Sequence, residues 1–362
     1  MSNRPHRNLL PAPWQSRAVF EIEGRPFTVL DVIRAADIRG DLPPLLDRSR
    51  HAQACERRAA VEGLEPDLEA VESMMDDFRY ARGLVTVEET ERWLEEYSLT
   101  ADDLSDHFLR CHWVASYSRR ENPAPDDPDT VPSYWAADLA ISGDLLRLAQ
   151  DLAREAAGAR HHKPPTPAQE AELLAEFRTG RAFDEAGYAA WRADWDLTDP
   201  AVAAILSAQR QFGQDRQDAL TPARRTAALI ELRTALTRIE LITVQFDSAE
   251  AAHEAYLCAT ADGLTLENVA AEAGYPVRHE SAFLRQFPED WHVHLLGAIP
   301  GRTLPPLGNQ GAHEVCRVLS HTEPQLTDPD VVAHLDGILL ERQFGRLESL
   351  DVRWLLNTEG VR

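Results

Sequence analysis

The chain has 362 residues, of which 44% are hydrophobic, so it is long enough for two or three domains with cores of ordinary size. Its 60 acidic and 37 basic residues give a formal net charge of −23. A surface of that sign repels nucleic acid and favours a basic or neutral polypeptide as partner. The four cysteines lie far apart without a Cys-x-x-Cys spacing, which favours buried thiols over disulfides or zinc ligands.

The N-terminus and the hydropathy of the chain bear on its location. Residues 1–7 are basic, but a proline-containing segment follows in place of the long apolar run of a signal peptide. No stretch has the length and apolarity of a membrane span. We therefore expect a cytoplasmic protein without a membrane partner. The sequence also lacks a glycine-rich phosphate loop, His-Glu-x-x-His and Gly-x-Ser-x-Gly, so no cofactor is expected.

The first part of the chain predicts helices after one short strand. Residues 19–23 alternate like a half-buried strand, and Thr28 and Asp67 each begin a helix. Residues 86–89 and 100–103 fit the capping-box pattern and predict two more helices. The segment 121–129, rich in proline and aspartate, predicts an exposed loop. Residues 134–157 predict one further helix.

Part of this helical region occurs twice. Phe78 corresponds to Phe177 at an offset of 99 residues, and Trp93 corresponds to Trp191 at an offset of 98. Each copy has a short break and a second helix between these anchors. Either a duplicated helical hairpin or the convergence of two amphipathic helix pairs would explain this similarity.

Between residues 237 and 321 the helical periodicity gives way to a mixed pattern. Residues 238–247 are rich in β-branched side chains and predict a strand. Ser248 and Thr265 then cap two helices, which end near Gly263 and Gly274. We expect an irregular segment or short strand next, then a helix, and finally a hairpin that includes a strand from residue 313 to residue 319.

This order resembles the parvulin-type peptidyl-prolyl isomerase domain. The similar pieces are the first strand with its Ala-rich helix, the segment 262–266, the approach at 301–307, and Gly311-Ala312-His313, which is similar to the family's Gly-x-His strand entry. The resemblance implies His313 as the catalytic residue. It implies an apolar peptide-binding wall made of Phe283, Phe287, Trp291 and Leu307.

The sequence departs from the parvulin pattern in two places. Glu240-Leu241-Ile242 stands where the family has His-Ile-Leu, and residues 279–283 stand where it has Gly-Asp-Leu-Gly. Isomerisation needs no nucleophile, only an apolar pocket with polar groups that stabilise the twisted X-Pro bond against its resonance. We therefore predict a degenerate domain that still binds extended peptide. An active peptidyl-prolyl isomerase is the alternative, and for His313 a structural role in its strand is the other interpretation.

The end of the chain resembles SurA-like foldases, whose C-terminal segment returns to the helical N-terminal domain. The similar pieces are the Val-x-Trp ending at 352–354 and the stretch from Phe78 to Leu94. We predict that residues 352–356 pair with 19–23 and that Trp354 packs on Phe20 or Ile22.

These features predict an α+β protein in three parts. They are a helical SurA-like N-terminal domain (1–235), a parvulin-like domain with a four-stranded sheet and helices (236–322), and a C-terminal helix and strand that return to the first domain (323–362). The implied function is a peptide-binding chaperone or foldase that holds an extended or proline-containing polypeptide. A narrower form follows from the resemblance to SurA-like proteins of peptide maturation, in which the client is a precursor peptide and a peptide-modifying enzyme is a second partner.

A metal-dependent enzyme is the remaining alternative. His279, His292, His294 and His313 are its candidate ligands. Residues 288–296 look helical, which puts His292 and His294 on different faces. The adjacent His161 and His162 also lack further ligands nearby in the sequence. We therefore expect no metal site.

Overall fold

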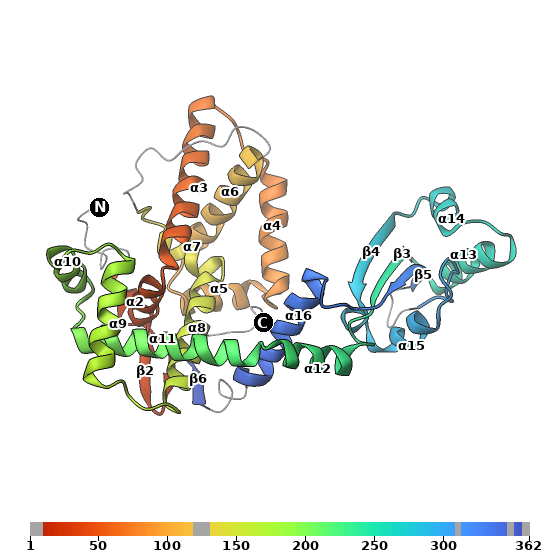
Figure 1. Ribbon diagram of the computed structural model, residues 1–362. Helices are drawn as coiled ribbons and strands as arrows, with labels where there is room; N and C mark the ends of the chain where they lie inside the picture. The colour runs from red at the N-terminus through yellow and green to blue at the C-terminus, as the bar shows by residue number, and fades with distance from the viewer. Residues whose placement is uncertain (1–9, 119–130, 308–312, 346–350, 357–362) are drawn as a thin grey trace. The chain divides into compact units, whose positions relative to one another are not determined.

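A computed structural model describes residues 10–118, 131–307, 313–345 and 351–356. The chain divides into two compact units, unit 1 with residues 1–216 and 344–362, and unit 2 with residues 217–343 (Figure 1). The helix α11 (Asp199–Ala219) contains one division, and the π-helical turn η3 (Glu341–Gly345) contains the other. The loop expected at 121–129 lies outside the described residues.

The sheet of unit 1 is made from both ends of the chain. Its central strand β1 (Ala18–Ile22) pairs antiparallel with β2 (Arg25–Thr28) and with β6 (Val352–Trp354). Phe20 lies opposite Trp354, and the centroids of their rings are 5.4 Å apart. The predicted return of the C-terminal strand to the first strand is confirmed.

The rest of unit 1 is helical, and most helices begin where the sequence predicts. Thr28, Thr86 and Thr166 each form a capping box. The expected single helix at 134–157 is wrong, because Gly143 has a left-handed φ of 82° and ends one helix before the next begins. The helices are α1 (Ala12–Gln15), α2 (Val29–Arg39), α3 (Leu42–Glu62), α4 (Leu68–Ala81), α5 (Val87–Glu96), α6 (Ala101–Ser118), α7 (Trp135–Ile141), α8 (Asp144–Ala159), α9 (Pro167–Gly180), α10 (Glu185–Trp195) and most of α11.

The two similar helical hairpins, α4–α5 and α9–α10, share an aromatic contact. Phe78 and Trp93 meet at 5.4 Å in the first hairpin, and Phe177 and Trp191 meet at 5.1 Å in the second. All four side chains belong to the main core of unit 1. The similarity between the two sequence segments is therefore matched by a similar aromatic contact in the structure. The duplication itself stays a prediction.

Unit 2 is built on a three-stranded antiparallel sheet with the order β4-β3-β5 (Figure 1). The expected fourth strand is absent from the described residues, since Thr303 and Leu307 make only isolated bridges to β5. The elements are α12 (Pro222–Leu232), β3 (Arg238–Phe246), α13 (Ala249–Ala261), α14 (Leu266–Ala273), β4 (Val277–Phe283), η2 (Leu284–Gln286), α15 (Glu289–Gly297), β5 (His313–Thr322) and α16 (Pro329–Leu340).

The two faces of this sheet carry separate apolar clusters, because strand side chains alternate between faces. Ile239 and Leu241 of β3 pack with α15 and the segment 298–307. Ile242 and Val244 pack with α13 and α14. A side chain's place along β3 or β5 therefore decides which helices it can contact.

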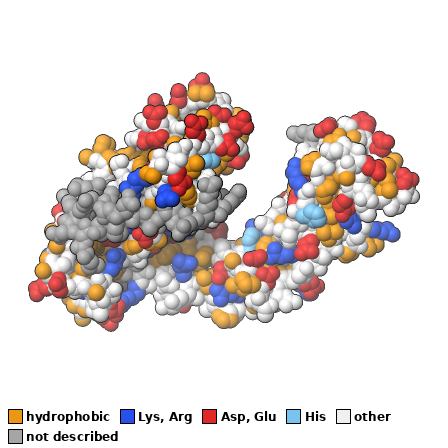
Figure 2. Space-filling model, turned by 90° about the horizontal axis from the view of Figure 1, so that it is seen from above, with side chains coloured by type: hydrophobic (Ala, Val, Ile, Leu, Met, Phe, Trp, Pro, Cys, Tyr) orange, Lys and Arg blue, Asp and Glu red, His pale blue; other side chains and the backbone are white. Residues whose placement is uncertain are grey.

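The surface of both units mixes acidic side chains with basic ones (Figure 2). In the part of the chain that the structure describes, no helix combines the length and apolarity needed to cross a bilayer. The expectation of buried thiols holds for Cys55 and Cys316 and is wrong for Cys111 and Cys258, which are half-buried; all four are free.

Candidate functional site

The four apolar residues predicted to bind peptide are buried in the interior of unit 2. Phe287, Trp291 and Leu307 belong to the cluster between the sheet and α15, each with less than a tenth of its surface exposed. Phe283 lies in another cluster, with Val331 of α16. A peptide would have to displace part of this interior to contact them, so their predicted role depends on an opening between the sheet and α15.

His313 lies on the opposite face of the sheet. It begins β5 opposite Phe246, whose side chain packs in the cluster with α13 and α14. Phe287, Trp291 and Leu307 pack against the other face. The structure therefore does not bring His313 together with the predicted apolar wall, and its catalytic role stays a prediction.

A different polar group lies on the α15 face. Thr243 of β3 is the cross-strand partner of Cys316 in β5, and both are buried. The Thr243 hydroxyl donates a hydrogen bond of 3.2 Å to Glu280 Oε1 of β4. This group, which also includes Glu314, lies beside the apolar cluster that contains Leu307.

The surroundings of this group disfavour ionisation of Cys316 and Glu314. Burial, together with the charges of Glu314 and Glu280, raises the pKa of Cys316 to about 12, so its thiol is neutral at pH 7. Burial and Glu280 likewise raise the pKa of Glu314, while Arg278 opposes that shift. The result is a neutral thiol with a hydroxyl and two carboxyl groups close to it, at the end of an apolar layer. The sequence reasoning missed it, because only the register of the strands brings these residues together.

The two edges of the unit 2 sheet differ. The outer side of β5 is bridged by Thr303 and Leu307. Among the described residues no strand pairs with the outer side of β4, and Arg278, His279 and Ser281 along it are exposed. β4 has seven residues, a length of roughly 23 Å at about 3.3 Å per residue. Its edge is long enough for several main-chain hydrogen bonds to an extended peptide.

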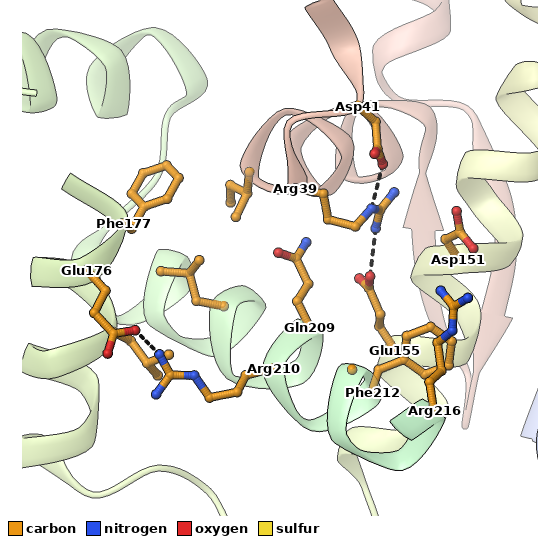
Figure 3. Close-up of a pocket in the computed structure, with 14 residues that line it drawn as sticks. Arg39, Asp41, Asp151, Glu155, Glu176, Phe177, Gln209, Arg210, Phe212 and Arg216 are labelled. Carbon is orange, nitrogen blue, oxygen red and sulfur yellow. Dashed lines mark hydrogen bonds and ion pairs between the residues drawn. The ribbon is translucent and has the colours of Figure 1, made fainter. Parts of the chain in front are cut away.

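Unit 1 contains a pocket of about 580 Å³ around a buried ion pair (Figure 3). Arg39 at the end of α2 lies between two carboxylates, 2.9 Å from Glu155 of α8 and 2.6 Å from Asp41. Gln209 of α11 projects into the same pocket (Figure 3), and its Nε2 donates a hydrogen bond of 3.0 Å to the carbonyl of Ala35. The other lining residues are Ile38, Asp151, Leu173, Glu176, Phe177, Leu206, Arg210, Phe212, Gly213 and Arg216.

Two atoms of the ion pair in this pocket lack a hydrogen-bond partner. Burial and the charge of Asp151 raise the pKa of Glu155 to about 7, although Arg39 opposes the shift. Arg39 Nη2 and Glu155 Oε2 are buried without a hydrogen-bond partner.

The histidines of the metal hypothesis do not assemble. His292 Nε2 lies 2.9 Å from the carbonyl of Phe287, and His279 lies on the α13 face of the sheet. His161 and His162 approach two different carboxylates, those of Asp351 and Asp215. Within the described ranges no three His, Cys, Asp or Glu side chains are grouped closely enough to hold a metal ion.

Comparisons with known proteins give limited likeness. No protein-family model and no curated protein matches the chain. Among solved structures, the chain is similar to the peptidylprolyl isomerase PrsA of Bacillus anthracis at 8% identity and a TM-score of 0.30, covering 56% of this chain and 96% of that one. The foldase protein PrsA of Lactococcus lactis is 12% identical, with a TM-score of 0.25 and coverage of 60% and 90%.

A third solved structure, one of two SurA-like chaperones of Campylobacter jejuni, is 13% identical, with a TM-score of 0.21 and coverage of 60% and 88%. These proteins are foldases and chaperones of the group that the sequence resembles. At such scores the likeness does not carry the function, which has to be argued from the residues.

Proposed function

We propose that this protein is a polypeptide-binding protein of the chaperone type, and that unit 2 holds an extended client segment along the outer edge of β4. The observation behind the proposal is the difference between the two sheet edges, since among the described residues the outer side of β5 is bridged and that of β4 is not. Addition of a strand to an open edge uses main-chain hydrogen bonds, so it accepts many sequences. That property suits a protein that holds unfolded chains.

The side chains of β4 support binding and oppose self-association. An open edge is a hazard for pairing between identical chains, and charged side chains on it reduce that hazard. Arg278, His279 and Glu280 place both signs of charge along the edge. The net charge of −23 further disfavours pairing of two copies, and it favours a basic or neutral client.

A binding experiment tests the proposal. Anisotropy of a labelled, permanently unfolded polypeptide would be titrated with the full chain, with an Ser281→Pro variant and with a Ser320→Pro variant. Proline removes an N–H and blocks pairing, so Ser281→Pro on β4 should weaken binding about tenfold or more. Ser320→Pro makes the same substitution on β5 and is the matched control. Edge binding would be contradicted if both variants weakened binding equally or if neither weakened it. Circular dichroism would confirm that each variant is folded.

The narrower role concerns the client. A precursor peptide held for a modifying enzyme would use the same edge, with specificity from the side chains that flank it. Co-purification of the full chain with a short peptide and an enzyme that modifies it would support this role. Equal affinity for unrelated unfolded chains would support a general chaperone instead. A cytoplasmic location belongs to the same proposal.

Prolyl isomerisation is the second candidate, and the group on the α15 face favours it. Thr243, Glu280 and Cys316 present polar atoms next to apolar side chains, which is the combination that a twisted X-Pro bond needs. A protease-coupled assay on X-Pro peptides measures this activity. If the group acts, Thr243→Val should reduce the rate and His313→Ala should not, because His313 lies on the other face. An inert wild-type protein would exclude this candidate.

A further inference from the structure

A second pocket in unit 1 lies where α3, α6 and α7 meet. Its volume is about 340 Å³, and apolar side chains make up most of its wall. A few polar groups converge at one side, which is the usual composition of a small-molecule site. The lining residues are Leu45, Arg48, Ser49, Ala52, His107, Arg110, Cys111, Val114, Ala115, Asp138, Leu139 and Ser142.

On the polar side of this pocket a thiol, an imidazole and a carboxylate lie in a row, each in contact with the next. Cys111 Sγ lies 3.5 Å from His107 Nε2, and His107 Nδ1 lies 2.8 Å from Asp138 Oδ1. Cys111 and His107 are one turn apart on α6, and Asp138 comes from α7. A nucleophile in contact with a base, which a third group orients, is the arrangement used in covalent catalysis.

The charges around the imidazole favour its protonated form. Burial lowers the pKa of His107, but the bonds to Asp138 and Cys111 outweigh that effect and raise the pKa to about 9. A protonated imidazole next to a sulfur stabilises the thiolate, which is the nucleophilic form of cysteine.

The neighbouring charged groups that face this site come from all three helices. In the pocket wall they are Arg48 from α3, Arg110 from α6 and Asp138 from α7. Glu56 of α3 lies close enough to interact electrostatically with Asp106, Arg110 and Asp138.

Arg110 supplies a separate indication of a ligand. Its side chain is only 5% exposed, lines the pocket and donates to Asp138 Oδ1 at 2.7 Å. Its Nε atom is buried without a hydrogen-bond partner. An unpaired donor of a charged group in a mostly apolar cavity is costly, and an oxygen atom of a bound molecule would satisfy it.

We propose that Cys111 is a nucleophile that accepts an acyl group from an apolar acyl thioester bound in this pocket. The apolar wall formed by Leu45, Ala52, Val114, Ala115 and Leu139 takes the hydrocarbon chain, and the carbonyl oxygen faces Arg110. A thioester fits because its exchange with a thiol makes a bond of the same kind as the one that breaks.

The step balances without an oxidant or reductant. The Cys111 thiolate adds to the carbonyl carbon, and the bond between that carbon and the carrier sulfur breaks. The carrier thiolate leaves with its electron pair and takes the proton from His107 Nε2. The products are the S-acylated Cys111 and the free carrier thiol. Asp138 is a positioning residue, because it holds the imidazole through Nδ1.

The chain contains its own matched control. His51 and Cys55 on α3 have the same spacing and the same 3.5 Å contact between Nε2 and Sγ. Cys55, however, is fully buried, and burial raises the pKa of its thiol. The proposal therefore predicts that contact between histidine and cysteine is not sufficient, and that only Cys111 reacts.

The test uses the full chain and S-octanoyl-N-acetylcysteamine as the probe. Intact mass and peptide mapping should show one added octanoyl group, on Cys111, with none on Cys55 and little on the half-buried Cys258. Cys111→Ser should abolish the adduct. His107→Asn should slow acylation by about 100-fold, as expected for loss of an acid–base group. Alkylation of each variant with iodoacetamide shows whether the thiol is still accessible.

The pH profile separates activation from a structural role. In the wild-type protein the acylation rate should change little from pH 6 to pH 8, because His107 stays protonated next to the Cys111 sulfur over that range and stabilises the attacking form of the thiol. In His107→Asn it should rise with pH toward the ordinary thiol pKa of about 8.5. Absence of acylation at Cys111, equal reaction at Cys258, or a wild-type profile that rises like that of the variant would overturn the proposal. The wild-type profile decides the question even if the variant fails to fold.

Discussion

The two units bury polar groups in different ways. In the described part of unit 1, Asp37, Arg110 and Glu155 are charged side chains with almost no exposed surface. In the described part of unit 2, the buried polar side chain is Thr243, and charged residues lie at the strand edges. Unit 1 is therefore held by specific pairs that join distant helices, whereas unit 2 is an apolar sandwich with polar edges. Substitutions of charged residues should cost stability in unit 1 and binding in unit 2.

The largest expected effect comes from breaking the ion pair in the Figure 3 pocket. Glu155→Ala leaves Arg39 with one fewer partner in a buried position, which should destabilise unit 1 by about 3–5 kcal/mol. Urea denaturation measures this loss. The double variant Arg39→Met, Glu155→Leu removes both charges and should lose much less. A double variant as unstable as the single one would show that the charges are not the cause.

The next largest effect is a pH dependence of the stability of unit 1 that comes from His107. His107 has a folded pKa of about 9 against its ordinary 6.5, so its contribution is complete below pH 6.5 and is lost as pH rises to 9. The difference corresponds to about 3 kcal/mol. Stability measured between pH 6 and pH 9.5 should fall in the wild-type protein and change less in His107→Asn. The same slope in both proteins would assign the dependence to other groups.

The strand from the end of the chain gives a smaller effect. Trp354→Ala removes the half-buried ring that packs at 5.4 Å on Phe20, and it should cost about 2 kcal/mol in unit 1. Trp354→Phe keeps an aromatic ring and should lose only about half as much stability. The melting temperature of each variant reports the loss. A change confined to the unfolding of unit 2 would contradict the pairing of β6 with β1.

The smallest effect should be equal in the two units. Thr86 caps α5 in unit 1 and Thr265 caps α14 in unit 2, each through its side-chain oxygen. Replacement by alanine at either position should cost about 1 kcal/mol. Denaturation of the two single variants tests whether local capping is independent of the surroundings. A loss several times larger at one site would mean that the threonine has another role there.

The helix caps and the return of the C-terminal strand could be predicted from the sequence. Ser248 and Thr265 cap helices as expected, because a cap depends only on the next three residues. The pairing of β6 with β1 was also predictable, since both segments alternate and the resemblance to SurA-like foldases implies that the end of the chain returns to the N-terminal domain.

The candidate sites were predicted less well, because they depend on register and on distant contacts. A strand places successive side chains on opposite faces, and this alternation separates His313 from Trp291. Arg39 and Glu155 are 116 residues apart, and no local pattern connects them. His107 and Cys111 did leave a signal, since they are four residues apart on a predicted helix, but the orienting Asp138 belongs to another helix.

The central claim is that unit 2 holds an extended polypeptide along β4. Hydrogen exchange of the full chain, measured by mass spectrometry with and without a saturating unfolded polypeptide, tests it most directly. The account predicts that amide protection on binding increases in residues 277–283 and not in residues 313–322. Protection confined to β5 or to unit 1, with β4 unchanged, would contradict it.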